Sequence, residues 1–373
     1  MQVLMLSLDK GILETDSAVQ RRLVALAEKT GEITVLVPGE RDEKRLVSEH
    51  LTVYSFGGAK IMQLWKMWRT GKRLLAFHLS LLTRVDLITV QDPYFLGLMG
   101  YFLSRRFAVP LEIQVHGFEK LRGLRAHLAK FVLLRAHMVR VVSERLKREL
   151  DLRFTIYDLG RKIYVLPIYT QISTPPGAFK RKTVPYPFTF LTVGRLVPVK
   201  NIAMQIRALA KVAEKIPHVR LRVVGDGPLL ESLKLEVKSL KLEDKAIFEG
   251  YQKDLERYYE EADAFLLTSD SEGWGRVVLE AAAHKLPIIM TDVGLAREVI
   301  KNEENGLIIP IQDEDELARA MQEFLDKPEL RACFGEAAFK TFKSLPSREA
   351  YIEKQIIAWK RVSSPAANIE RTA

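Results

Sequence analysis

The chain has very little cysteine: Cys333 is the single one among 373 residues. One thiol excludes a disulfide framework and any metal cluster built from cysteines. Low cysteine usage is typical of a reducing compartment, so we expect a cytoplasmic protein.

Long hydrophobic runs are also missing. No stretch of 18 apolar residues occurs, and the longest candidate, residues 94–103, has ten, too few to span a bilayer. The first residues, MQVLMLSLDKG, lack a basic segment and a cleavage site, so we expect a first core strand rather than a signal peptide. No Walker A sequence occurs, which argues against a P-loop kinase. No G-x-S-x-G sequence occurs either, which argues against a nucleophilic serine on such an elbow.

The composition is that of a soluble globular protein, with 47% hydrophobic and 28% charged residues. Its length allows about two domains. The charge is uneven: residues 1–180 contain 28 Lys and Arg against 17 Asp and Glu, whereas the remainder contains 29 against 30. The basic first half suits an anionic partner such as a membrane surface, a phosphorylated acceptor or nucleic acid, or is a generic basic surface that maintains solubility.

Apolar runs typical of strands alternate with amphipathic helical patterns along the whole chain. We expect strands at residues 3–8, 33–37, 51–54, 86–90, 111–115, 138–142, 163–166, 188–193, 221–224, 246–249, 264–268, 287–291 and 307–309. We expect helices at residues 17–29, 60–82, 121–136, 202–215, 229–240, 255–262, 277–284, 314–325 and 348–361. This order predicts an α/β protein with two doubly wound, Rossmann-like parallel sheets. The aperiodic, Pro- and Thr-rich segment 170–187 is the expected divide, and the last helix could pack on either domain.

The most informative stretch is TSDSEGWGRVVLEAAAHKLPIIMTDVG, from Thr268 to Gly294. A strand is expected to end at Thr268, and a helix to begin near Arg276 after a glycine-containing loop. Small residues let a ligand approach the backbone, and a helix N-terminus with an adjacent arginine suits a phosphate. Functional sites in such sheets lie beyond the carboxyl ends of strands, which is where this loop falls.

Glu272 and Glu280 lie eight residues apart in this stretch. Eight residues of regular helix rise about 12 Å, so the two carboxylates suit two distant hydroxyl-bearing parts of one long ligand, such as a sugar and a ribose joined by diphosphate. The alternative is a carboxylate at a helix N-terminus, Glu272, with a solvated or paired Glu280.

Two further strand ends carry charged or glycine-rich loops. Arg195 and Lys200 follow the strand at 188–193, where they could hold phosphate or be solvated loop cations, and Asn201 can cap the next helix. The turn Gly225-Asp226-Gly227-Pro228 could border a nucleotide base or simply turn the chain.

In the first half, His116 follows a strand and could donate or relay a proton near neutral pH. Asp92, Tyr94 and Ser143 lie at other strand ends. In the second half, the acidic run at residues 313–315 could be a metal-binding carboxylate pair, but capping of the following helix and pairing with its dipole explain it better.

With these residues the chain resembles the family 4 retaining glycosyltransferases of the GT-B architecture, in which two Rossmann-like domains face each other across a cleft. The resemblance covers nearly the whole chain and is strongest at 188–310. The matching motifs are Gly194-Arg195-Leu196 with Lys200-Asn201, Gly225-Asp226-Gly227-Pro228, Phe248-Glu249-Gly250-Tyr251, the pair Glu272 and Glu280 with seven residues between them, Pro287, Gly294, Glu298, His116-Gly117 and Ser143-Glu144.

The resemblance implies an enzyme that uses a nucleotide-diphosphate sugar and needs no metal or other cofactor. It implies an acceptor-binding domain at 1–170, a donor-binding domain at 171–347, and a C-terminal helix at 348–365 that packs back on the first. Arg195 and Lys200 would hold the diphosphate, Glu280 the ribose and Glu272 the sugar, with His116 near the reacting carbon. The implied catalytic residues are His116, Glu272, Arg195 and Lys200. The implied donor-binding residues are Gly11, Arg195, Lys200, Gly225, Gly227, Glu272, Gly273, Trp274, Gly275, Arg276, Val277 and Glu280, and the acceptor side would comprise Asp92, Tyr94, His116 and Ser143.

Two positions depart from the family pattern. The usual Gly-Gly pair of the first loop is reduced to Gly11, and the usual Pro-Asn-Gly-Val-Asp is Pro-Ile-Tyr-Thr-Gln at 167–171. These departures put the contacts near the diphosphate and at the hinge in question.

Residues 60–82 combine Trp65 and Trp68 with five Lys and Arg. Such a segment can lie in a membrane interface, so we expect a glycan or lipid-linked acceptor and peripheral attachment to an anionic inner membrane leaflet. The alternative is a core helix with a solvated basic face. A sugar-nucleotide epimerase of the same architecture remains a second enzyme class, and a basic membrane- or nucleic-acid-binding protein a third. No nucleic acid partner is expected, because no nucleic-acid-binding motif occurs.

Overall fold

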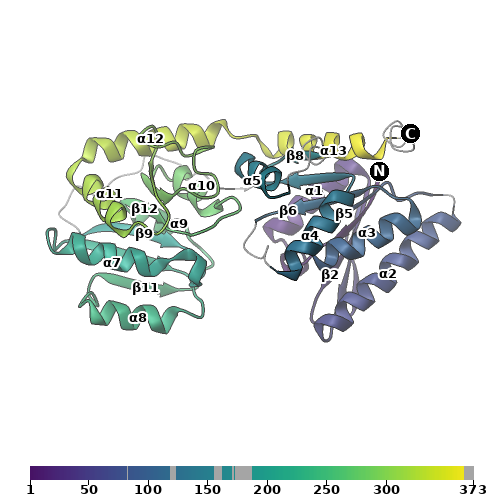
Figure 1. Cartoon of the computed structure of the whole chain (residues 1–373), viewed down its shortest axis with the longest axis horizontal. Coiled ribbons are helices and arrows are strands. Elements are labelled where there is room, and N and C mark those ends of the chain that lie inside the picture. The colour runs from purple at the N-terminus through teal and green to yellow at the C-terminus, as the bar shows by residue number, and fades with distance from the viewer. Residues whose placement is uncertain (82, 118–122, 155–161, 170–171, 173–186, 365–373) are drawn as a thin grey trace. The chain divides into compact units, whose positions relative to one another are not determined.

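The computed structural model describes residues 1–81, 83–117, 123–154, 162–169, 172 and 187–364 (Figure 1). The chain divides into two compact units: Met1–Tyr169 with Pro346–Ala373, and Thr170–Leu345. The expected divide at 170–187 lies almost entirely outside the described residues, as do Thr170 and Gln171 of the segment that departs from the family pattern.

The first unit contains an eight-stranded sheet in the order β3-β4-β2-β1-β5-β6-β7-β8. Its strands are β1 (Gln2–Leu6), β2 (Glu32–Pro38), β3 (Glu43–Ser48), β4 (Leu51–Phe56), β5 (Leu87–Val90), β6 (Leu111–Val115), β7 (Met138–Val141) and β8 (Ile163–Val165). All neighbours are parallel except β3 and β4. The sequence pattern did not predict β3, since this edge strand, EKRLVS, has no apolar run.

Helices cover both faces of this sheet: α1 (Ala18–Thr30), α2 (Lys60–Ser80), α3 (Phe95–Phe107), α4 (Leu124–Arg135), α5 (Glu144–Phe154) and α13 (Arg348–Ser363). Side chains of α1 and α13, among them Leu23, Leu26, Tyr351 and Trp359, share one buried core with the strands. The helix α3 was not predicted, because its apolar residues leave no polar face from which a helical period could be recognised.

The C-terminal helix α13 is tied to the first sheet by buried polar groups. Glu112 in β6 is fully buried and accepts hydrogen bonds from Trp359 Nε1 at 3.0 Å and Gln355 Nε2 at 3.3 Å. Arg140 in β7 is also buried and donates to Tyr351 OH at 2.6 Å. Buried polar groups are costly unless they are hydrogen-bonded, so α13 completes the packing of this sheet.

Replacing Trp359 by phenylalanine is expected to lower the free energy of unfolding by about 1.5 kcal/mol, measured by urea denaturation followed by circular dichroism. Phenylalanine fills most of the space but cannot donate to the Glu112 carboxylate. This loss of stability is at the low end of the range for a hydrogen bond to a carboxylate, because Glu112 also accepts hydrogen bonds from Thr89, Gln114 and Tyr164. The control is Trp65→Phe at a side chain that is 52% exposed, where a change within about 0.5 kcal/mol is expected. Equal losses in the two variants would contradict this account.

The second unit contains a six-stranded, fully parallel sheet in the order β11-β10-β9-β12-β13-β14. Its strands are β9 (Phe188–Val193), β10 (Val219–Val224), β11 (Ala246–Gly250), β12 (Ala264–Leu267), β13 (Ile288–Thr291) and β14 (Leu307–Ile309). Its helices are α7 (Ile202–Ala213), α8 (Leu230–Ser239), α9 (Glu256–Glu261), α10 (Arg276–Ala283), α11 (Glu314–Asp326) and α12 (Pro328–Ser344), of which α12 was not predicted. The predicted α/β class with two doubly wound sheets is confirmed.

Candidate active site

The loop after β9 carries both cations that were predicted to hold phosphate. Gly194 and the exposed Arg195 follow the strand, and a short 3-10 turn, Pro198–Lys200, brings Lys200 back towards the sheet. Lys200 Nζ contacts Glu272 Oε1, and the two side chains are 20% and 11% exposed. A partly buried ion pair therefore joins this loop to the loop between β12 and α10.

The Gly225 turn packs against the Arg195 loop. Gly225 has φ +139°, and a Cβ there would lie 1.9 Å from the carbonyl oxygen of Gly194. A Cβ at Gly227 would lie 2.5 Å from the carbonyl oxygen of Leu196. The structure thus gives a reason for both glycines that the sequence did not, because two loops approach too closely here for a side chain. A role beside a nucleotide base stays a prediction.

The loop between β12 and α10 holds Glu272 in place. Ser269 Oγ donates to Glu272 Oε1 at 2.8 Å, on the same oxygen that Lys200 contacts. Gly275, in the left-handed region at φ +89°, occupies the N-cap of α10, so the helix begins only at Arg276. Glu272 therefore lies ahead of the helix, and its separation from Glu280 is not the rise of a regular helix.

Glu280 has its own set of partners. Tyr259 OH in α9 donates to Glu280 Oε2 at 2.8 Å, and Arg276, one turn earlier, lies 3.8 Å from Glu280 Oε1. Tyr259 is 2% exposed, and burial together with the nearby carboxylate raises the pKa of its hydroxyl well above the usual value. The hydroxyl thus remains a hydrogen-bond donor at neutral pH, and the two glutamates of the motif have different surroundings.

Trp274, in the loop between β12 and α10, packs against the turn at Gly294. The Trp274 side chain is 5% exposed, and its indole N–H has no hydrogen-bond partner among the described residues. The turn at Gly294 is hydrogen-bonded to this loop, because Leu295 N donates to Trp274 O at 3.0 Å. A Cβ at Gly294 would lie 2.7 Å from that same oxygen, so the position requires glycine.

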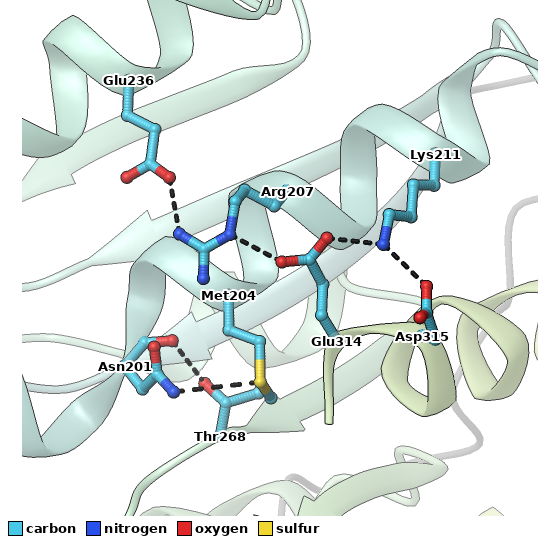
Figure 2. A network of polar contacts seen from close by, with 8 residues as sticks. All are labelled: Asn201, Met204, Arg207, Lys211, Glu236, Thr268, Glu314 and Asp315. Carbon is cyan, nitrogen blue, oxygen red and sulfur yellow. Dashed lines mark hydrogen bonds and ion pairs between the residues drawn. The ribbon is translucent and has the colours of Figure 1, made fainter. Parts of the chain in front are cut away.

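Asn201 occupies the N-cap position of α7, but its side chain makes no capping hydrogen bond. Its amide donates instead to Asp270 Oδ1 at 3.3 Å and to Met204 Sδ at 3.8 Å. Thr268 Oγ1 lies 3.1 Å from the carbonyl oxygen of Asn201 (Figure 2). It also lies 3.1 Å from the carbonyl oxygen of Lys200. The end of β12 is thereby joined to the Lys200 loop, which differs from the side-chain cap predicted for Asn201.

The acidic run at 313–315 has structural partners (Figure 2). Asp313 accepts from Glu316 N at 2.9 Å, which confirms the predicted cap of α11. Glu314 lies between Arg207 and Lys211 at 2.6 Å from each, and Asp315 is 2.7 Å from Lys211. Among the residues that the structure describes, no group of three or more possible metal ligands occurs.

His116 follows β6 in the first unit and is partly buried beside a small cavity. Gln91, Gln114 and Arg140 line the same cavity. Burial, and then the positive charges of Arg140 and Arg22, lower the pKa of His116 to about 3. His116 is therefore neutral near pH 7, and its predicted role near the reacting carbon stays a prediction.

The other first-unit candidates have local roles. Asp92 Oδ1 accepts from Tyr94 N at 2.9 Å and Leu96 N at 3.4 Å at the start of α3, and Tyr94 is buried. Ser143 is 1% exposed and accepts from Leu146 N at 3.1 Å at the start of α5. Gly11 lies in a 3-10 turn whose N-cap is Asp9. Asp92 and Ser143 thus have local structural contacts at the starts of helices. The acceptor-side roles of Asp92, Tyr94 and Ser143 and the donor-side role of Gly11 stay predictions.

Sequence reasoning did not find Tyr259, Ser269 or Thr268. Ser269 and Thr268 were in the motif stretch but carried no separate signal. Tyr259 lies 21 residues before Glu280, on another helix, and no spacing in the sequence marks that contact. Packing of α9 beside α10 brings the hydroxyl to the carboxylate.

Two family models match the chain. The one described as "Glycosyl transferases group 1" matches residues 178–341, and "Glycosyltransferase Family 4" matches residues 19–167. An uncharacterized glycosyltransferase of Haemophilus influenzae is 30% identical over 47% of this chain and 48% of its own length. The alpha-monoglucosyldiacylglycerol synthase of Streptococcus pneumoniae is 27% identical over 65% of this chain and 59% of its own length. The chain thus spans about half the length of these curated relatives.

Solved structures show the same architecture. Anabaena HepE, crystallised in complex with UDP, superposes with a TM-score of 0.76 over 97% of this chain and 100% of its own, at 18% sequence identity. Identity this low supports the fold alone, which is the two-sheet GT-B architecture. With both halves matched by family models and the fold shared, the chain belongs to the group 1, family 4 glycosyltransferases.

Proposed function

We propose that this protein is a retaining glycosyltransferase that moves a sugar from a nucleotide-diphosphate sugar to a hydroxyl of a glycan or a lipid-linked acceptor. The donor would bind the second unit and the acceptor the first. No metal would be needed, because cations and backbone N–H groups would neutralise the leaving diphosphate.

One observation carries the donor assignment: Lys200, Glu272 and Glu280 are held on loops and a helix at the carboxyl ends of β9 and β12, each with defined partners. Lys200 would bind the diphosphate with Arg195, and Glu280 the ribose hydroxyls. Glu272 would bind the sugar. Donor binding would exchange the contact between Lys200 and Glu272 for contacts with the diphosphate and the sugar hydroxyls.

The chemistry follows from where charge develops. As the bond between the anomeric carbon and the diphosphate breaks, negative charge grows on the leaving oxygen. Positively charged groups and a helix N-terminus that are already in place stabilise that charge at little reorganisation cost. We propose that the acceptor hydroxyl attacks on the face from which the diphosphate departs and that its proton passes to the leaving diphosphate oxygen. The neutral His116 would hydrogen-bond near the reacting carbon.

A thermal-shift screen of nucleoside diphosphates and their sugars, with and without EDTA, tests this proposal. UDP and UDP-sugars come first, because HepE was crystallised with UDP. A ligand that binds only the folded state raises the melting temperature. We expect a shift with one base that EDTA does not abolish, followed by sugar transfer from that donor. No shift with any nucleotide at several millimolar, above the usual KM range, would overturn the donor assignment.

Replacing Tyr259 by phenylalanine is expected to weaken binding of the nucleoside diphosphate about fivefold, measured by calorimetric titration. The variant removes the hydrogen bond that orients the Glu280 carboxylate, and a loss of about 1 kcal/mol of ligand binding corresponds to this fivefold change. The matched control is Tyr258→Phe, the neighbouring buried tyrosine, whose hydroxyl contacts Arg257 instead. Equal weakening in both variants would indicate a general packing effect and contradict the orienting role.

A further inference from the structure

Three neighbouring helices of the first unit contain no acidic residue. The helices α2 (Lys60–Ser80), α3 (Phe95–Phe107) and α4 (Leu124–Arg135) together contain ten Lys and Arg and neither Asp nor Glu. The next helix, α5, contains Glu144, Glu149 and Asp151. The absence of carboxylates is therefore a property of these three helices rather than of the whole basic half.

The three helices lie side by side on one face of the first sheet (Figure 1). Helix α3 contacts both α2 and α4, while α1 and α13 contact each other on the opposite face. Parallel strands β4, β5, β6 and β7 are joined by these helices, and right-handed crossovers put them on the same side. We call the surface formed by these three helices the acid-free face, because they carry no carboxylate of their own; Asp42, which precedes β3, pairs with Lys66 of α2 at 2.7 Å.

Large apolar side chains are exposed among the cations of this face. Helix α2 runs unbroken through Gly71, and Ile61 is 84%, Trp65 52% and Phe77 58% exposed. The same holds for Leu79, Phe102 and Leu124, at 68%, 49% and 71%. Several basic side chains of α2 are exposed beside them: Lys60, Arg69, Lys72 and Arg73. The Arg69 guanidinium lies 5.4 Å from the centre of the Trp65 ring, so charge and aromatic surface are presented together.

We propose that the acid-free face docks on an anionic lipid bilayer, with its cations at the headgroups and Trp65, Ile61 and Phe77 inserted at the interface. A surface with cations and no carboxylates of its own favours a negatively charged partner. The exposed apolar side chains favour a bilayer over a soluble polyanion, because a polyanion offers no apolar phase in which to bury them. Among the described residues every helix is too short or too polar to span a membrane, so the contact would be peripheral.

Sedimentation of the full chain with vesicles tests the proposal. We expect binding to phosphatidylcholine vesicles that contain 30% phosphatidylglycerol, none to pure phosphatidylcholine, and weaker binding as salt rises. Each protein cation at the lipid headgroups contributes roughly a fivefold change in the partition coefficient between vesicles and water. The double variant Arg69→Gln with Arg73→Gln is therefore expected to weaken vesicle binding about 25-fold. Trp65→Ser should weaken it about tenfold without a change in net charge.

Matched controls lie in the second unit. Lys238→Gln with Lys253→Gln removes two exposed cations, and Leu235→Ser removes an apolar side chain that is 68% exposed. Both are expected to leave vesicle binding within about twofold of the parent. The proposal is overturned if the chain does not sediment with anionic vesicles at low salt, or if the control charge variant loses as much binding. It is equally overturned if Trp65→Ser binds vesicles unchanged while heparin or RNA competes fully, which would indicate a polyanion site.

Discussion

Replacing Lys200 by glutamine is expected to lower kcat/KM for sugar transfer about 10²–10³-fold, the range found when one preorganised group that stabilises developing charge is removed. Lys200 is partly buried, and its ammonium would shift from Glu272 to the diphosphate when the donor binds. Glutamine retains most of the length of the side chain without its charge. The measurement is steady-state transfer with the donor found in the nucleotide screen.

Lys211→Gln is the matched control for this prediction. Lys211 is a lysine of the same unit that also pairs with carboxylates, Glu314 and Asp315, but it lies on α7 away from the motif loops. We expect its kcat/KM to stay within about twofold. If Lys200→Gln retained the parent rate at an unchanged melting temperature, Lys200 would not bind the leaving group.

Replacing Glu280 by alanine is expected to weaken nucleoside diphosphate binding about 10–100-fold. The variant removes a carboxylate whose hydrogen bonds are charge-assisted, each worth about 1.5–3 kcal/mol, and leaves the buried Tyr259 hydroxyl without its acceptor. The dissociation constant is measured by calorimetric titration at constant salt. Glu236→Ala, which removes a carboxylate paired with Arg207 on the same unit, is the control and should leave binding unchanged.

The 2′-deoxynucleotide separates a ribose contact from a general loss of fold. The parent protein should bind the ribonucleotide more tightly than its 2′-deoxy analogue, and Glu280→Ala should lose most of that preference. An unchanged preference in a folded variant would assign Glu280 to the structure of α10 and α9 rather than to the ribose.

Local signals in the sequence were enough to place the candidate donor-side residues at the ends of strands and in the following helix. Arg195 and Lys200 follow β9, Glu272 follows β12, and Glu280 lies within the next helix, α10. The hydrophobic period reveals the ends of these strands, and parallel strands bring their carboxyl ends to one edge. Partners that come from another element could not be predicted in this way. Tyr259 reaches Glu280 because α9 packs beside α10, and a hydrogen bond between two helices leaves no period in the sequence.

The first unit shows the same limit in its buried polar groups. Glu112 and Arg140 lie within apolar strand runs, where the sequence alone gives no reason for a charge. The structure pairs them with Tyr351, Gln355 and Trp359 of α13, more than 200 residues later. Burial, and then the charge of Arg140, lower the pKa of His116 to about 3, and neither cause is visible in the local sequence.

The sequence by itself determined the α/β class, the order of nearly all strands and of most helices, and the family, because hydrophobic period and motif spacing are local properties. The ranges of α3, α5 and α12 were not among the predicted helices. The tertiary structure alone decided which helices share a face and which partners surround each charge. It joined three helices without carboxylates into one surface and brought α13 to the first sheet. Those outcomes depend on packing between segments distant in the chain, and on the free-energy cost of leaving buried polar groups unpaired, which no local pattern records.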